Sequence, residues 1–188
     1  MCGIVGYVGQ RSASEVVLGG LARLEYRGYD SAGIAIVVPG NSVVSHKKAG
    51  KLSVLRDELE ANPLAQGTTG IGHTRWATHG PPTDANAHPH LADGGKLALI
   101  HNGIIENFDE LKSELQAQGE QFHSDTDSEV AAVMLGLAFQ ETQDLTLAMR
   151  AVVARLEGSF TLLGVHQDQP DVVVGARRNS PLVVGLGQ

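Results

Sequence analysis

The sequence predicts an α+β domain with layered sheets, and three observations support this fold class. Apolar runs rich in β-branched residues fall into two groups, one near the start and one near the end of the chain. Segments with helical spacing of apolar residues lie between these groups, most of them introduced by capping signals. The 188 residues, 42% hydrophobic and 19% charged, match an ordinary globular domain with a sizeable core. No repeat or interdomain linker divides the chain, so we expect one domain.

The first half of the chain should contain strands, two helices and a hairpin. Ser12 with Glu15 three positions later is a capping-box signature for a helix reaching about Tyr26. Pro39-Gly40-Asn41 is a strong turn signal between two short strands. The expected elements are a buried strand at 3–8, a helix at 12–26, a turn at 27–33, strands at 34–38 and 42–47, and a helix at 52–60. Strands at 70–73 and 96–101 should follow, separated by a loop at 74–95 that is too long to lack a function.

The second half should be helical first and then form strands. Two further cap signals, Asn107 with Glu110 and Thr126 with Glu129, predict helices to about residues 119 and 140. We expect another helix at 145–156 and strands at 160–165, 172–175 and 182–184. Because the last strand signal reaches the end of the chain, we expect the natural polypeptide to continue beyond Gln188; an ordinary terminal strand is the alternative.

Charge and hydropathy exclude several classes of protein. The net charge is −7 and basic residues form no run longer than a pair, so a nucleic-acid partner is not expected. No apolar stretch approaches the ~18 residues of a membrane span. Gly3, Gly6 and Gly9 interrupt what would be the apolar core of a secretion signal. We therefore expect a cytoplasmic protein without a membrane partner.

The chain has one cysteine, and it directly follows the initiator Met1. An intrachain disulfide or a cysteine-based zinc site is therefore excluded, and a small buried hydrophobe is the default interpretation. A thiol with a pKa of about 8.5 needs a base to become a nucleophile at neutral pH. Removal of Met1 would give Cys2 a free α-amine with a pKa of about 7.7–8.0, which could take that proton. A histidine elsewhere in the fold is the alternative base.

Several segments together resemble one enzyme family. The opening Cys-Gly-Ile-Val-Gly resembles the start of the class II glutamine amidotransferases, a branch of the N-terminal-nucleophile hydrolases. Other segments are similar to the glutaminase half of the glutamine–fructose-6-phosphate aminotransferases, the glucosamine-6-phosphate synthases. These segments are Leu-Glu-Tyr-Arg-Gly-Tyr-Asp-Ser-Ala-Gly (24–33), His-Thr-Arg-Trp-Ala-Thr-His-Gly (73–80), Asn-Ala-His-Pro-His (86–90), His-Asn-Gly-Ile-Ile-Glu-Asn (101–107) and Ser-Asp-Thr-Asp-Ser-Glu (124–129).

The resemblance runs from Cys2 to Gln188 and implies a four-layer αββα sandwich, truncated at its C-terminus. Residues 2–188 would form one glutaminase domain, and two sugar-phosphate isomerase domains would be missing. The full-length protein would be a homo-oligomer. No cofactor is implied.

The resemblance assigns the nucleophile and the oxyanion hole. Cys2 would attack the glutamine amide, while the Asn102 side chain and the Gly103 backbone N–H would stabilise the oxyanion. On spacing alone, Asn102-Gly103 at the end of an apolar strand would more readily be a turn.

Arg75 and Asp127 are the charge pair that the resemblance assigns to the substrate. Arg75 would bind the α-carboxylate of glutamine and Asp127 its α-ammonium group, together with Thr78, His79 and the Gly103 backbone. Charges this far apart in sequence are otherwise usually solvated.

Trp76 would belong to a glutamine-responsive lid at residues 75–82 and gate the passage of ammonia. A core anchor is the alternative for this single tryptophan. His88 would line the glutamine pocket, while Arg27 and His101 would support the nucleophile and the oxyanion hole. A helix C-terminal charge is the alternative for Arg27. His88-Pro89-His90 lacks carboxylate or thiol partners, so we expect no metal site.

The expected reaction is hydrolysis of L-glutamine to glutamate and ammonia through a Cys2 thioester. Fructose 6-phosphate would be a substrate only through the missing isomerase domains. One alternative is another class II amidotransferase, such as an amidophosphoribosyl transferase or an asparagine synthetase relative. The other is an idle glutamine-binding module, which applies if Met1 is retained.

Overall fold

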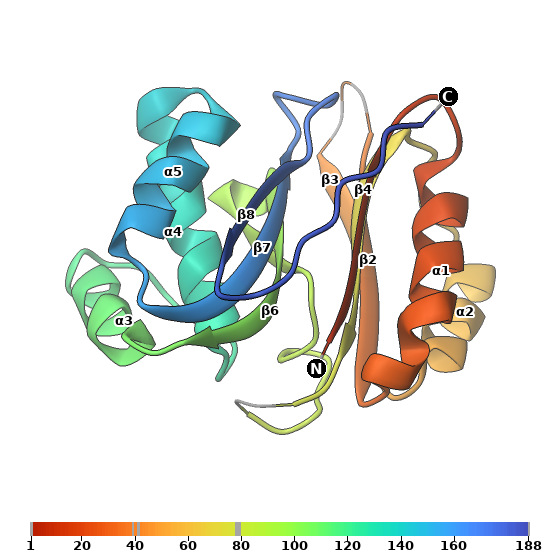
Figure 1. The fold of residues 1–188 in the computed structure, drawn as a ribbon, viewed down its shortest axis with the longest axis horizontal. Helices are drawn as coiled ribbons and strands as arrows, with labels where there is room; N and C mark the ends of the chain where they lie inside the picture. The colour runs from red at the N-terminus through yellow and green to blue at the C-terminus, as the bar shows by residue number, and fades with distance from the viewer. Residues whose placement is uncertain (1, 39, 41, 78–79, 188) are drawn as a thin grey trace.

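Two antiparallel four-stranded sheets stack face to face, and helices cover the outer face of each sheet (Figure 1). The computed structural model describes residues 2–38, 40, 42–77 and 80–187. The first sheet has the order β1-β4-β2-β3, with strands β1 Gly3–Val8, β2 Ser31–Val37, β3 Val43–Ala49 and β4 Thr69–Arg75. The second has the order β5-β6-β7-β8, with strands β5 His90–Ala92, β6 Leu97–Ile105, β7 Gly158–His166 and β8 Val174–Arg178.

Two helices cover the first sheet, and three lie outside the second, two of them on its strands and the third against a neighbouring helix (Figure 1). The first group is α1 Ala13–Leu24 and α2 Leu52–Ala61; the second is α3 Phe108–Ala117, α4 Asp127–Thr142 and α5 Leu145–Arg155. Short 3₁₀ turns lie at η1 Glu25–Arg27 and η2 Asp93–Gly95. This arrangement confirms the predicted α+β class and the αββα layers. Among the described residues, no helix combines the length and the apolar character that a membrane crossing needs.

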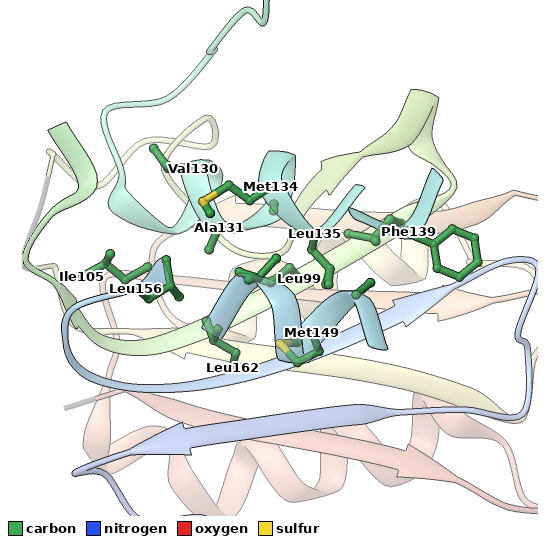
Figure 2. Packing of buried hydrophobic residues seen from close by; sticks show 14 of the residues in the cluster. Leu99, Ile105, Val130, Ala131, Met134, Leu135, Phe139, Met149, Leu156 and Leu162 are labelled. Atoms are coloured by element: carbon green, nitrogen blue, oxygen red, sulfur yellow. The ribbon is translucent and has the colours of Figure 1, made fainter. Parts of the chain in front are cut away.

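Three apolar clusters hold the layers together. Between the two sheets, Ile71 of β4 packs with Ile100 of β6 and Val165 of β7. Outside the second sheet, the inner faces of α4 and α5 pack on β6 and β7, as Leu135, Met149, Leu99 and Leu162 show in Figure 2. The third cluster joins α1 and α2 to the outer face of β2. The ends of both sheets are thereby fixed relative to each other.

Most predicted elements are confirmed, with shifted boundaries. Ser12 accepts from the Glu15 backbone N–H at 3.4 Å and Thr126 from that of Glu129 at 3.4 Å, as the two cap signals predicted. β1 is only partly buried, although a buried strand was predicted. β2 begins at Ser31, inside the predicted turn, because Ser31 already pairs with Arg75 of β4. Pro39 and Asn41 of the predicted turn lie outside the described residues.

Three expectations were wrong. Asn107 precedes α3 but makes no side-chain cap bond; its amide instead donates to Arg155 O at 2.9 Å and accepts from Glu157 N at 3.0 Å. The loop at 74–95 is partly structured, because β5 and η2 lie within it. Residues 182–184 form no strand, since no described strand pairs with them.

The register of the sheets determines which residues meet at one end of the sandwich. β1 runs antiparallel to β4 with Gly3 opposite Thr74, so Cys2 lies beside the end of β4, where Arg75 is. β6 of the second sheet brings Asn102 to the same place, because the Cys2 main-chain nitrogen donates to Asn102 Oδ1 at 3.1 Å. Residues 100 positions apart therefore meet between the sheet ends.

Candidate active site

A pocket lies between the sheet ends and gathers most of the residues predicted for the site. Its walls come from the N-terminal segment, the end of β4, the loop before β5, β6 and the start of α4. The lining residues are Cys2, Arg75, Trp76, His88, His101, Gly103, Thr126, Asp127 and Ser128. Thr78 and His79, also predicted for substrate binding, lie outside the described residues.

Cys2 is partly buried at the edge of this pocket. Its Sγ accepts a hydrogen bond from the Trp76 backbone N–H at 3.4 Å and lies 3.8 Å from Trp76 O. Burial raises the pKa of the Cys2 thiol above its ordinary value, and the Trp76 N–H opposes this by stabilising the thiolate. The thiol is therefore mostly protonated at neutral pH and needs a base to become nucleophilic.

Asn102 and Gly103 lie within β6, opposite Thr161 and Phe160 of β7, so the turn interpretation of Asn-Gly is wrong. The backbone of Gly103 has a φ of 139°. A Cβ atom there would lie 2.1 Å from Ser159 O, which pairing with β7 holds in place. Glycine is thus required at this position both by φ and by the closeness of β7.

Asp127 begins α4 and is buried, with 3% of its surface exposed. Its Oδ2 accepts from the Ile105 backbone N–H at 2.9 Å, and its Oδ1 from the Ser128 hydroxyl at 3.2 Å. Ser128 Oγ also lies 2.9 Å from His101 Nδ1. The carboxylate is therefore fixed by β6 on one side and by its own helix on the other.

Arg75 is the last residue of β4 and is equally buried, with 3% exposed. Its guanidinium donates to Gly80 O at 3.1 Å and Pro81 O at 3.3 Å. The alternative that Arg75 and Asp127 are merely solvated charges is therefore wrong. The fold brings a basic side chain from the end of β4 and an acidic one from the start of α4 to the walls of one pocket.

Buried histidines lie beneath and beside the pocket. The rings of His73 and His88 stack at 4.1 Å between centroids, and the His88 and His90 rings meet edge to face at 4.7 Å. Neither ring nitrogen of His88 has a hydrogen-bond partner within the described part of the chain. Burial lowers the pKa of His73 to about 3 and that of His88 well below its ordinary value, so both are neutral at pH 7. The described residues contain no cluster suited to a metal ion.

The segment that carries His88 is held by β3. Lys47 Nζ donates to Ala85 O at 3.1 Å and to Ala87 O at 2.8 Å. Asp84 Oδ1 accepts from the Ala49 backbone N–H at 2.7 Å. This tethering gives His88 a fixed place in the pocket wall.

Trp76 is 47% exposed, so the core-anchor alternative is wrong. Its ring meets that of Tyr29 edge to face at 5.4 Å between centroids. Arg27 does not line the pocket: its Nε donates to the Tyr26 hydroxyl at 3.1 Å. The predicted supporting role of Arg27 stays a prediction.

Sequence reasoning missed two groups at the pocket, the hydroxyls of Thr126 and Ser128. Thr126 was predicted only as a helix cap, yet its Oγ1 also lies 2.9 Å from His90 Nε2. Ser128 had no assigned role. Its position beside Asp127 at a helix start was the available signal, because the first turn of a helix directs short polar side chains toward nearby groups.

The chain is similar to a known protein family and, over its whole length, to curated relatives. The model of the family described as "Glutamine amidotransferase domain" matches residues 73–185, more than half of the chain. Curated proteins named glutamine–fructose-6-phosphate aminotransferase (isomerizing) are similar along the whole chain. That of Leifsonia xyli subsp. xyli is 65% identical and that of Corynebacterium diphtheriae 61%. The chain spans 30% and 31% of the length of these two relatives.

Two solved structures are similar to the chain, and the first of them is named as a glutamine amidotransferase. The glutamine phosphoribosylpyrophosphate amidotransferase of B. subtilis matches 89% of this chain and 35% of its own, with a TM-score of 0.73 and 27% identity. A second structure, titled as the allosteric regulatory enzyme of purine biosynthesis, has a TM-score of 0.75 and 28% identity over 89% of this chain and 36% of its own. The chain belongs to the glutamine amidotransferase domain family.

Proposed function

We propose that this chain hydrolyses the side-chain amide of L-glutamine, with Cys2 as nucleophile once Met1 has been removed. One observation carries this proposal. A single pocket brings the sulfur of Cys2 together with a buried cation, Arg75, and a buried anion, Asp127. Opposite charges at fixed places suit the α-carboxylate and α-ammonium groups of a free amino acid. The side-chain amide of that amino acid would then reach toward Cys2.

Asn102 and Gly103 supply the oxyanion hole in this proposal. Because Asn102 Oδ1 accepts from the Cys2 nitrogen, the Nδ2 side of the amide is its donor side. Gly103 lines the pocket and contributes its backbone N–H. Two such donors would stabilise the negative oxygen of the tetrahedral intermediate.

The α-amine of processed Cys2 is the base. It takes the thiol proton as Sγ forms a bond to the amide carbon, and the carbonyl electrons move to oxygen. Collapse of the intermediate breaks the C–N bond, and the amine returns the proton so that ammonia leaves. Water then attacks the thioester by the same route, releasing glutamate and restoring the thiol.

The longer protein would use the ammonia for an acceptor. We propose that residues 2–188 form its glutaminase domain and that isomerase domains outside this chain aminate fructose 6-phosphate. The names of the curated relatives support the sugar acceptor. Nothing in the site favours another acceptor, and the expected homo-oligomer and the gating role of Trp76 stay predictions.

The test is glutamate release from L-glutamine by the chain whose loss of Met1 has been verified by intact mass. Cys2→Ala should abolish release. Because Cys2 is the only cysteine, iodoacetamide modifies a single site and should block release in proportion to its incorporation. Exposed Ser53→Ala on α2 is the matched control, since it removes one heteroatom far from the pocket. Unchanged release by Cys2→Ala, or full activity with Met1 retained, would overturn the proposal.

A further inference from the structure

The turn at residues 28–30 lies against the segment that follows β4. Gly28 is so close to Arg75 that a Cβ atom would lie 2.6 Å from the Arg75 carbonyl carbon. Tyr29 meets the Trp76 ring edge to face. Asp30 makes the polar contacts of this turn with the segment, and they lie on both sides of Trp76.

Asp30 binds the residue before Trp76 and the residue after it. Its backbone N–H donates to Arg75 O at 3.1 Å. Its carboxylate Oδ2 accepts a hydrogen bond from the Ala77 backbone N–H. The peptide groups on either side of Trp76 are therefore both fixed by one residue.

The segment fixed in this way is the one that touches the sulfur. The Trp76 N–H donates to Cys2 Sγ at 3.4 Å, and a donor at this place favours the thiolate over the thiol. A hydrogen bond of this kind depends on direction and distance, so a peptide that rotated away would lose it. Trp76 is half exposed, and its side chain provides little burial to hold the peptide in place.

Asp30 is itself held firmly enough to act as an anchor. The Ser31 hydroxyl, on a fully buried residue of β2, donates to Asp30 Oδ1 at 3.1 Å. The Gly50 backbone N–H, at the end of β3, donates to Asp30 O at 2.7 Å. Asp30 therefore transmits the rigidity of β2 and β3 to the peptide beside the sulfur.

We propose that Asp30 is a positioning residue that holds the Trp76 N–H against the Cys2 sulfur through its carboxylate contact with Ala77. This inference rests on the proposed function for its meaning in catalysis, but the contact with the sulfur can be measured without turnover. Asp30 acts on the thiol in two opposite ways. Its negative charge raises the pKa of Cys2, whereas its hold on the segment keeps in place the donor that lowers it.

Two substitutions separate these effects. Asp30→Asn removes the charge but keeps one oxygen, which can still accept from the Ala77 N–H. The amide nitrogen then faces the Ser31 hydroxyl, which can accept from it. Asp30→Ala removes the charge and the acceptor together. The difference between the two variants therefore measures the part of the hold that the side chain provides, since the backbone contact of Asp30 with Arg75 O remains in both. Arg75 and the N-terminal amine are the other charged groups that act on the thiol, and both are unchanged in the two variants.

The measurement is the rate of Cys2 alkylation by iodoacetamide as a function of pH, on chains whose loss of Met1 is verified by mass. We expect the pKa of Cys2 in Asp30→Asn to lie below that of the wild type. In Asp30→Ala it should lie above that of Asp30→Asn by about one unit, which slows alkylation below the pKa about tenfold. Asp144→Asn is the matched control, because Asp144 is also a carboxylate that accepts a backbone N–H, at the start of α5 and away from the pocket, and it should leave the profile unchanged.

The second measurement is the steady-state kinetics of glutamine hydrolysis by the two variants. Asp30→Ala should lower kcat about tenfold relative to Asp30→Asn and change KM much less, since the residue acts on the nucleophile. Identical alkylation profiles for the two variants would overturn the inference. If Asp30→Ala does not fold, a Cys2 pKa in Asp30→Asn that is not below the wild-type value overturns it as well. Absence of glutamate release by the wild type would instead refute the proposed function, and the alkylation comparison would still stand.

Discussion

Gly103→Ala should be among the most destabilising single-methyl additions in this domain. The added Cβ has two separate costs. At a φ of 139°, an L side chain is strained by about 1–3 kcal/mol. The Cβ would also lie 2.1 Å from Ser159 O and 2.7 Å from Phe160 Cα, which are backbone atoms of the paired strand β7. Forcing these strands apart should cost about another 1–3 kcal/mol.

The matched control is Gly119→Ala at the C-terminal end of α3. Gly119 has a φ of 101°, but a Cβ atom there would meet no atom within 4 Å. This variant therefore carries only the strain from φ, about 1–3 kcal/mol. The difference between the two variants isolates the steric cost of approaching β7.

Urea unfolding followed by circular dichroism is the assay. The total cost at Gly103, about 2–6 kcal/mol, is a large share of the ~5–15 kcal/mol that typically stabilises a domain. With an m-value of about 2 kcal/mol/M, the midpoint should fall by roughly 1–3 M, and by half of that or less for Gly119→Ala. Equal midpoints for the two variants at equal m-values would refute the reasoning, because they would mean that β7 yields without cost.

Two further predictions concern the buried groups around the pocket. Ser128→Ala removes the hydroxyl that donates to Asp127 and contacts His101, so the KM for glutamine should rise about tenfold with little change in kcat. Steady-state kinetics of glutamate release measure both constants, and Ser128→Thr should restore most of the affinity for glutamine. An unchanged KM in Ser128→Ala would contradict this prediction. His73 has its pKa lowered to about 3 and stays neutral in the fold, whereas the unfolded chain takes up a proton below about pH 6.5. The unfolded state therefore binds more protons, and stability should fall by about 1.4 kcal/mol per pH unit below pH 6.5 down to about pH 3. Urea midpoints at pH 5 and 6.5 should differ less in His73→Asn than in the wild type, and equal differences would count against the assignment.

Local signals in the sequence predicted the helices well because their causes are local. A cap such as Ser12 or Thr126 binds a backbone N–H three residues away, so spacing alone reveals it. Asn107 shows the limit of this logic. It carries the same signal, but its amide bonds to the end of α5, about 50 residues away in the sequence.

Strand predictions failed where pairing decides the structure. Asn102-Gly103 has the composition of a turn, yet β7 pairs with both residues and makes them part of β6. Residues 182–184 are apolar and two of them are β-branched, but the described chain offers them no partner strand. A strand depends on hydrogen bonds from elsewhere, so its presence cannot be read from its own residues.

Resemblance pointed to most of the residues that line the pocket, though not to Thr126 or Ser128, and it gave no signal for Asp30 and Lys47. Arg75 and Asp127 carry charges suited to a ligand, so a motif identifies them. Asp30 and Lys47 act through backbone atoms of distant segments, Ala77 for the first and Ala85 and Ala87 for the second. Such contacts exist only after the sheets have formed, and no spacing in the sequence indicates them.

The distribution of charge in the pocket bears on what it would select. Burial holds His73 and His88 neutral, and the described pocket walls carry one guanidinium, Arg75, and one carboxylate, Asp127. A simple amide has no charged group that could bind either side chain. A zwitterionic amino acid meets both charges at once and leaves its side chain for the neutral region formed by Asn102, Gly103 and Cys2. A basic and an acidic side chain, both buried in one pocket, thus argue for recognition of the whole amino acid and not of its amide alone.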